Sequence, residues 1–130
     1  MSIKYVLDTH TLIWAVRDPA RLGLKARRIL ESAARGEIGI PSPVIEELGR
    51  LINEDAFTLH GRPSDVFAAA LEYHGVIPMS LNAAIAAPVL RLPHSDPYDR
   101  LIVATALDLG VPLLTKDGNI TDSGIVRVIW

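Results

Sequence analysis

Residues 96–117 read DPYDRLIVATALDLGVPLLTKD, and this stretch decides the fold. Pro97 suits the first position of a helix and Gly110 suits the residue just past its end, so we expect a helix over residues 96–109. The apolar run at residues 111–114 follows at once and predicts a short strand that is buried on both faces. A helix that leads directly into a buried strand is typical of an α/β protein.

The same alternation extends in both directions along the chain. The expected strands are residues 3–7, 37–40, 75–78, 111–114 and 126–129. The expected helices are residues 9–16, 21–35 with Gly36 at the end, a helix that begins at Pro43 with Ser42 as its N-cap, a helix from Ser64 or Asp65 to about Tyr73, 80–87 and 96–109. We therefore expect one domain, residues 1–130, with an α/β fold: a three-layer α/β/α sandwich around a mainly parallel central sheet.

The composition is that of an ordinary folded domain, with 49% hydrophobic and 22% charged residues. No apolar run approaches the roughly 18 to 20 residues that span a bilayer, so we expect no membrane segment. The absence of cysteine excludes disulfides and thiolate metal sites and fits a cytoplasmic location. Thirteen basic against fifteen acidic residues give a net charge of −2, so any contact with nucleic acid must come from a local patch.

Carboxylates follow the ends of two expected strands. Asp8 comes directly after the strand at residues 3–7, and Asp117 follows the strand at 111–114 after only two residues. Asp99 lies in the first turn of the helix that leads into the second of these strands. Because ligands in open α/β sheets bind beyond the carboxyl ends of the strands, we expect these three side chains to share one crevice.

Two adjacent glutamates compete for a fourth place in this cluster. If Leu48 marks the centre of an apolar helix face, Glu47 lies on its flank, whereas Glu46 lies about 160° away at 100° per residue. Glu47 is therefore the expected member, and Glu46 is the alternative.

Each of these carboxylates also has a purely structural interpretation. Asp8 and Asp117 have the positions of turn or cap residues, and Asp96 has that of an N-cap with Asp99 as its partner. Several carboxylates at one edge of a sheet nevertheless repel one another unless protons or cations offset their charge. An all-oxygen set suits Mg²⁺ or Mn²⁺, and these ions commonly act on phosphate esters. The cluster thus favours phosphoryl chemistry.

At these positions the sequence resembles the PIN domain family, and within it the VapC-type toxins of bacterial toxin–antitoxin pairs. The matching stretches are LDTHTLIW at 7–14, EL within SPVIEELGRL at 42–51, DPYDRLIVATA at 96–106 and LTKD at 114–117. They span nearly the whole chain. The resemblance implies an Mg²⁺-dependent endoribonuclease with a catalytic quartet at Asp8, Glu47, Asp99 and Asp117. It also implies a homodimer and a small antitoxin that covers the crevice, in a heterotetramer or larger assembly.

In the mechanism that the resemblance implies, one or two Mg²⁺ ions polarise the scissile phosphate and activate a water, which leaves 5′-phosphate and 3′-hydroxyl ends. Asp8 and Asp117 would be direct metal ligands, and Glu47 and Asp99 would ligate directly or through water. The interval from Ser42 to Glu47 is about one residue shorter than is usual in the family, which keeps Glu46 as the alternative. Asp96 is a further candidate ligand, since the DP-aromatic-DR variant carries it.

Substrate contacts require positive charge, and six of the thirteen basic residues fall between Arg17 and Arg35. On one continuous helix, Arg21, Lys25 and Arg28 would share a face. That face is either a solvated surface or a contact for the phosphate backbone of RNA.

Other residues near the cluster have less direct interpretations. His10 and Trp14 share a face of the first helix and are expected to be packing groups. Thr9 and Thr115 are candidates to hydrogen-bond a metal-bound water. Arg100 either pairs with the neighbouring carboxylate or contacts a phosphate.

Two other functions compete with a nuclease. An aspartate-dependent phosphatase would use Asp8 as a nucleophile, but such enzymes usually need a second Asp two residues on, where this chain has His10. A PIN-like module that has lost activity and only binds a partner protein is the second rival. The complete carboxylate quartet argues against it.

Overall fold

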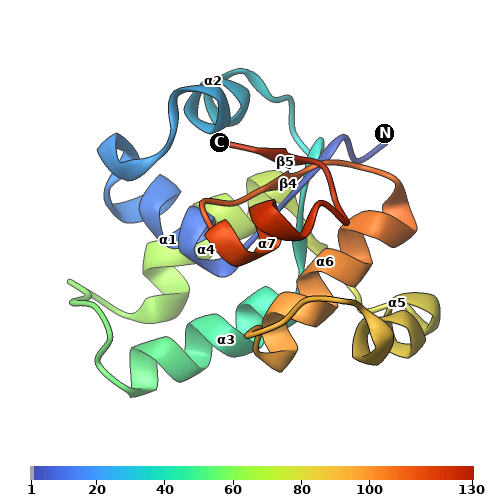
Figure 1. Ribbon diagram of the computed structural model, residues 1–130. Coiled ribbons are helices and arrows are strands. Elements are labelled where there is room, and N and C mark those ends of the chain that lie inside the picture. The colour runs from blue at the N-terminus through green and yellow to red at the C-terminus, as the bar shows by residue number, and fades with distance from the viewer. Residues whose placement is uncertain (1) are drawn as a thin grey trace.

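The computed structural model describes residues 2–130 and has the α/β architecture that the sequence predicts (Figure 1). Its strands are all parallel and lie in the order β3-β2-β1-β4-β5. Their bounds are β1 Tyr5–Leu7, β2 Ile38–Pro41, β3 Val76–Ile77, β4 Leu113–Leu114 and β5 Val128–Ile129. Each strand lies at a predicted position, but all except β2 are shorter than predicted: β1, β4 and β5 keep only the last residues of the predicted runs, and β3 keeps the central two.

The sheet is buried, as its continuous apolar runs predict. Val6 and Leu7 in β1 and both leucines of β4 have no exposed surface. Gly39 in β2 permits an unusually close approach of β3, because a Cβ at this position would lie 2.1 Å from Cδ1 of Ile77. A larger residue at position 39 would therefore displace the side chain of Ile77.

Helices cover both sides of the sheet (Figure 1). They are α1 Thr9–Arg17, α2 Leu24–Ser32, α3 Ser42–Asn53, α4 Pro63–His74, α5 Leu81–Ala86, α6 Pro97–Leu109 and α7 Gly118–Ser123, with short 3-10 turns at η1 Pro19–Arg21 and η2 Ala87–Val89. The chain moves outward in one direction from β1 through β2 to β3, then returns across the sheet to β4 and moves the other way to β5. With right-handed crossovers, this reversal places the two groups of helices on opposite faces and makes the β1/β4 junction a switch point.

The predicted helix over residues 21–35 is wrong at both ends. Its first residues form η1 instead, and the backbone is extended at Gly23, with ψ of 155°, so α2 begins only at Leu24. Gly23 packs tightly against the end of the chain, since a Cβ there would lie 2.4 Å from the carbonyl carbon of Trp130. This contact between distant segments interrupts the helix, and it separates Arg21 from the residues of α2.

Three helix starts also differ from prediction. Pro41, not Ser42, occupies the N-cap position of α3, and no side-chain bond caps this helix. Helix α4 starts at Pro63, one residue before the predicted start. Helix α7 was not predicted, because Asp117 and Gly118 have the sequence pattern of an ordinary turn. By contrast, Pro97 and Gly110 bound α6 as predicted, with Gly110 in the left-handed conformation at φ 68°.

No helix among residues 2–130 combines the length and apolar character needed to cross a membrane.

Candidate active site

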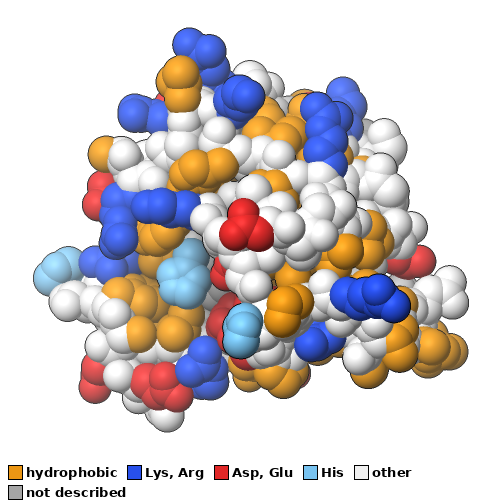
Figure 2. All heavy atoms as spheres, in the orientation of Figure 1, with side chains coloured by type: hydrophobic (Ala, Val, Ile, Leu, Met, Phe, Trp, Pro, Cys, Tyr) orange, Lys and Arg blue, Asp and Glu red, His pale blue; other side chains and the backbone are white. Residues whose placement is uncertain are grey.

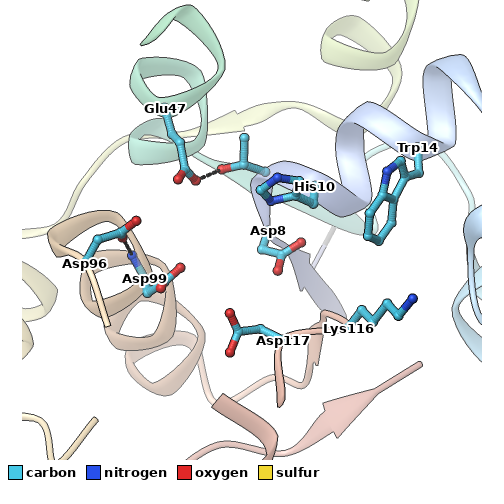
Figure 3. A pocket seen from close by; sticks show the side chains of 9 residues that line it. Asp8, His10, Trp14, Glu47, Asp96, Asp99, Lys116 and Asp117 are labelled. Atoms are coloured by element: carbon cyan, nitrogen blue, oxygen red, sulfur yellow. Dashed lines mark hydrogen bonds between the residues drawn. The ribbon is translucent and has the colours of Figure 1, made fainter. Parts of the chain in front are cut away.

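Four carboxylates from four segments line one pocket of about 390 Å³ at the carboxyl edge of the sheet (Figure 3). Asp8 follows β1 and Asp117 follows β4, and these strands are neighbours. Glu47 comes from α3 and Asp99 from the first turn of α6, and these two helices pack together. The structure thus brings together all four members of the predicted quartet, with Asp96 beside them.

Asp8 is held rigidly at the centre of this edge and is only 8% exposed. Its Oδ1 caps α1 by accepting from the Thr11 backbone N–H at 3.0 Å and lies 2.6 Å from the Thr11 hydroxyl. The Thr115 hydroxyl donates to its Oδ2. Burial raises the pKa of Asp8, and the bonds from Thr11 and Thr115 partly oppose that rise. The two threonines therefore fix the orientation of this carboxylate.

Glu47 and Glu46 have opposite surroundings. Glu47 is buried, at 6% exposed, and lines the pocket, whereas Glu46 is exposed and lies outside it. The Thr9 hydroxyl donates to Oε1 of Glu47, and Arg50 lies 3.5 Å from Oε2. Glu47 is thus buried and Glu46 exposed, as their helical positions relative to Leu48 predict.

The pKa of Asp99, like that of Asp8, is raised in this pocket. Its pKa is raised from 3.8 to about 7, first by burial and then by the negative charges of Asp96, Asp117 and Glu47. Asp96 Oδ1 caps α6 by accepting from the Asp99 backbone N–H at 2.9 Å. The predicted capping role of Asp96 is therefore confirmed, and Asp96 also lines the same pocket.

Asp117 makes two hydrogen bonds that stabilise the structure around it. Its Oδ1 accepts from the Ile120 backbone N–H at 2.9 Å and so caps the unpredicted helix α7. Its own N–H donates to the Thr115 hydroxyl oxygen at 3.0 Å. Thr115 therefore connects Asp117 to Asp8 and keeps the two strand-end carboxylates in register across β1 and β4.

The donor set fits a hard divalent cation in chemical type, because it is all oxygen and strongly anionic. Within residues 2–130, however, no three acidic or histidine side chains are already arranged around a common metal position. The reason is visible in the hydrogen bonds: hydroxyls hold Asp8 and Glu47, and helix N–H groups hold Asp96 and Asp117. Binding of a cation would therefore require small side-chain rotations toward the centre of the pocket.

The two threonines expected to orient a water instead bond carboxylates directly, Thr9 to Glu47 and Thr115 to Asp8. The predicted ion pair of Arg100 with Asp99 is wrong for the described residues, whereas its alternative contact with a phosphate stays a prediction. Its guanidinium donates to the backbone carbonyls of Leu90 at 2.6 Å and of Leu92 at 3.0 Å. Arg100 therefore fixes the loop before α6.

The sequence reasoning missed three residues of the pocket wall: His10, Trp14 and Lys116. The first two were expected to be packing groups, and Trp14 does pack against His10, Trp130 and the core, but both residues also line the pocket (Figure 3). Lys116 immediately precedes Asp117 at the end of β4, and this position is the signal that could have identified it. It is the one cation among the residues that line the described pocket.

The predicted basic face does not exist as one surface. Arg21 lies in η1 with its guanidinium 4.7 Å from the Trp14 ring centroid, close to the acidic pocket. Lys25 and Arg28 lie on α2 and line a different groove, together with Trp130. The break at Gly23 is the physical reason for this separation.

A doubly wound parallel sheet with a carboxylate pocket at its switch point defines a class of small α/β proteins with an acidic, cation-compatible site. The PIN domain family matches residues 5–124, and the chain belongs to this family.

Known relatives agree with this assignment. The chain is 33% identical to Ribonuclease VapC22 of Mycobacterium tuberculosis over 115 residues, which cover 86% of this chain and 85% of the relative. It is similar in fold to a chain of the VapBC2 structure from Rickettsia felis, with a TM-score of 0.73, 17% identity and coverage of 98% and 99%. It also resembles VapC20 of Mycobacterium tuberculosis, described as a Sarcin-Ricin loop cleaving toxin, with a TM-score of 0.64, 21% identity and coverage of 96% and 98%. The VapC-type resemblance of the sequence is thereby confirmed.

Proposed function

We propose that this protein is an Mg²⁺-dependent endoribonuclease, with Mn²⁺ as an alternative cofactor, and that it acts as the toxin of a toxin–antitoxin pair. The observation that carries the proposal is the convergence of Asp8, Glu47, Asp99 and Asp117 in one pocket. Burial first, and then the negative charges of the neighbouring carboxylates, raise the pKa of Asp99 to about 7, and a divalent cation would relieve that repulsion. Kinship with a ribonuclease of the same family supports the reaction class.

Asp8 and Asp117 are proposed as the residues that hold the cation. Asp99 and Glu47 complete its surroundings, and Asp96 is a further candidate ligand. When bound, Mg²⁺ supplies positive charge that polarises a phosphoryl oxygen and makes water more acidic. Thr115 and Thr9 keep the carboxylates of Asp8 and Glu47 oriented. Lys116, at the rim of the same pocket, offers a fixed positive charge to a phosphate oxygen.

An antitoxin partner is part of the proposal. Structures of relatives are described as VapBC and toxin–antitoxin complexes, which supports a partner protein for this chain. We propose that the antitoxin covers the acidic pocket, and that the nuclease forms a homodimer within a heterotetramer or larger assembly.

The deciding experiment incubates antitoxin-free protein with total RNA, with Mg²⁺ or with EDTA, and maps the ends. We expect cleavage only with Mg²⁺, leaving 5′-phosphate and 3′-hydroxyl ends. If the free protein leaves RNA intact under both conditions, the chain is a PIN-like module that binds its partner without catalysis.

A further inference from the structure

A second groove, of about 440 Å³, adjoins the acidic pocket. His10 and Trp14 line both cavities, so the two are continuous along this wall of α1. The groove runs from that wall past Arg17 and Arg21 to Phe57, which lies in the loop after α3. Its volume lies within the roughly 300–1,000 Å³ typical of small-ligand sites.

Three cations surround the shared wall, and each lies over an aromatic ring. The guanidinium of Arg21 lies 4.7 Å from the Trp14 ring centroid, and Nζ of Lys116 lies 5.8 Å from the same ring. The guanidinium of Arg17 lies 5.3 Å from the Phe57 ring centroid. An aromatic face attracts a cation without neutralising its charge, so these groups are positioned and still able to bind an anion.

The charge of the groove is not cancelled by acidic neighbours. Within residues 2–130, none of Arg17, Arg21 and Lys116 lies within 4.0 Å of a carboxylate oxygen, in contrast to Arg27 and Arg50, which both form ion pairs. Asp18 is the carboxylate that lines the groove, against two arginines. Figure 2 shows Lys and Arg side chains grouped at the left of this face, beside histidine and acidic side chains.

We propose that this groove is a subsite for the nucleotide next to the scissile phosphate of a single-stranded RNA. Arg17 and Arg21 contact the backbone phosphate, and the base lies against the aromatic wall of Trp14 and Phe57. The inference rests on the proposed nuclease function, because the adjoining phosphate must enter the acidic pocket. Single-stranded RNA fits better than a duplex, since aromatic side chains stack on bases that are not already stacked.

The test measures binding of a short fluorescein-labelled oligouridylate by anisotropy, with Ca²⁺ in place of Mg²⁺ so that binding is observed without cleavage. The double variant Arg17→Gln/Arg21→Gln should bind about tenfold more weakly. Loss of two phosphate contacts should also reduce the slope of log affinity against log salt by about 1.4, at about 0.7 for each contact with a single strand. Arg17→Lys/Arg21→Lys should retain most of the slope, because it keeps both charges.

The matched control is Lys25→Gln/Arg28→Gln, which removes two exposed cations that line a different groove. Its affinity and salt slope should stay close to those of the wild type. Phe57→Leu should weaken binding about fivefold with no change in salt slope, because it removes a stacking face and no charge. Thermal melting of each variant establishes that it is folded, and the exposed arginine pair decides the test if Phe57→Leu does not fold.

Wild-type affinity in both Arg17→Gln/Arg21→Gln and Phe57→Leu would overturn the subsite and leave the groove to another ligand, such as an acidic protein segment. An equal loss in the control pair would also overturn it, because binding would then follow net charge alone. A separate incubation with Mg²⁺ distinguishes the two proposals. If wild-type protein binds oligouridylate through the groove but never cuts RNA, the nuclease proposal fails, and the groove stands as a site that binds single-stranded RNA without a scissile phosphate beside it.

Discussion

The acidic pocket and the neighbouring basic groove share His10 and Trp14 but are built on different principles. In the pocket, the carboxylates are short side chains at strand ends and helix starts, and hydroxyls or backbone N–H groups fix most of them. In the groove, the charges sit on long, exposed side chains that rest on aromatic rings. The pocket carboxylates are therefore more restrained than the long side chains of the groove, which can adapt to the strand that they contact.

This difference has an electrostatic counterpart. In the pocket, burial and then neighbouring negative charges raise the pKa of Asp99 to about 7, while the groove next to it carries positive charge. A polyanion would be attracted along the groove and repelled by the pocket unless a cation were present there. Single changes to the pocket carboxylates should therefore have large effects on cleavage. Changes to the residues that orient these carboxylates should have smaller effects.

Asp8→Asn should produce the largest effect. Loss of this central negative charge should reduce RNA cleavage by about 10³-fold, on the scale of removing one essential electrostatic group. The fold should survive, because the remaining oxygen can still cap α1. The measurement is the initial rate of RNA cleavage in Mg²⁺. Asp122→Asn, the same change at an exposed position, serves as the control, and a cleavage rate in Asp8→Asn equal to that of the control would refute the assignment.

A comparison of the Glu47→Gln and Glu46→Gln variants should show which of the two adjacent glutamates is needed for cleavage. Removing the buried charge at Glu47 should lower cleavage by about 10- to 100-fold, the scale for groups that support a metal site. Glu46→Gln should change the rate less than about twofold, as is usual for an exposed side chain away from the site. Equal losses in both variants would show that the pocket geometry does not decide which glutamate acts.

Thr115→Val should show that orientation of the carboxylates matters as well as their charge. The valine keeps the volume but loses the hydroxyl that donates to Asp8 and accepts from the Asp117 N–H. We expect about a tenfold weaker apparent affinity for Mg²⁺, read from the Mg²⁺ dependence of cleavage. Thr115→Ser should restore it. An Mg²⁺ dependence in Thr115→Val identical to that of the wild type would count against this positioning role.

Asp99→Asn should give the smallest of these effects, which is a change in stability. It should stabilise the metal-free protein at pH 7 by about 1 kcal/mol, whereas the changes above weaken cleavage or metal binding. The raised pKa means that stability is lost as pH rises from about 4 to about 7, because the folded state favours the protonated form. The complete shift would correspond to about 4 kcal/mol, which partial exposure to solvent reduces. Urea unfolding in EDTA should show the gain at pH 7 and almost none near pH 4. A gain of equal size at both pH values would mean that charge repulsion is not its source.

The elements that could be predicted are those whose signals are local. Pro97 and Gly110 bound α6 as expected because capping chemistry acts within one turn of a helix. The break at Gly23 could not be predicted, since it depends on a contact with Trp130 at the other end of the chain. Helix α7 was not predicted because Asp117, its N-cap, and Gly118, its first residue, are equally typical of a turn.

The sequence by itself determined the alternation of strands and helices and the placing of Asp8, Asp99 and Asp117 at element ends. Both follow from apolar periodicity and local capping, which act over a few residues. Only the tertiary structure decided which basic and aromatic residues lie beside the predicted carboxylates. It brought Arg21 and Lys116 to the same tryptophan at the wall of the pocket. Such contacts depend on how segments distant in sequence pack together, and no local sequence pattern predicts them.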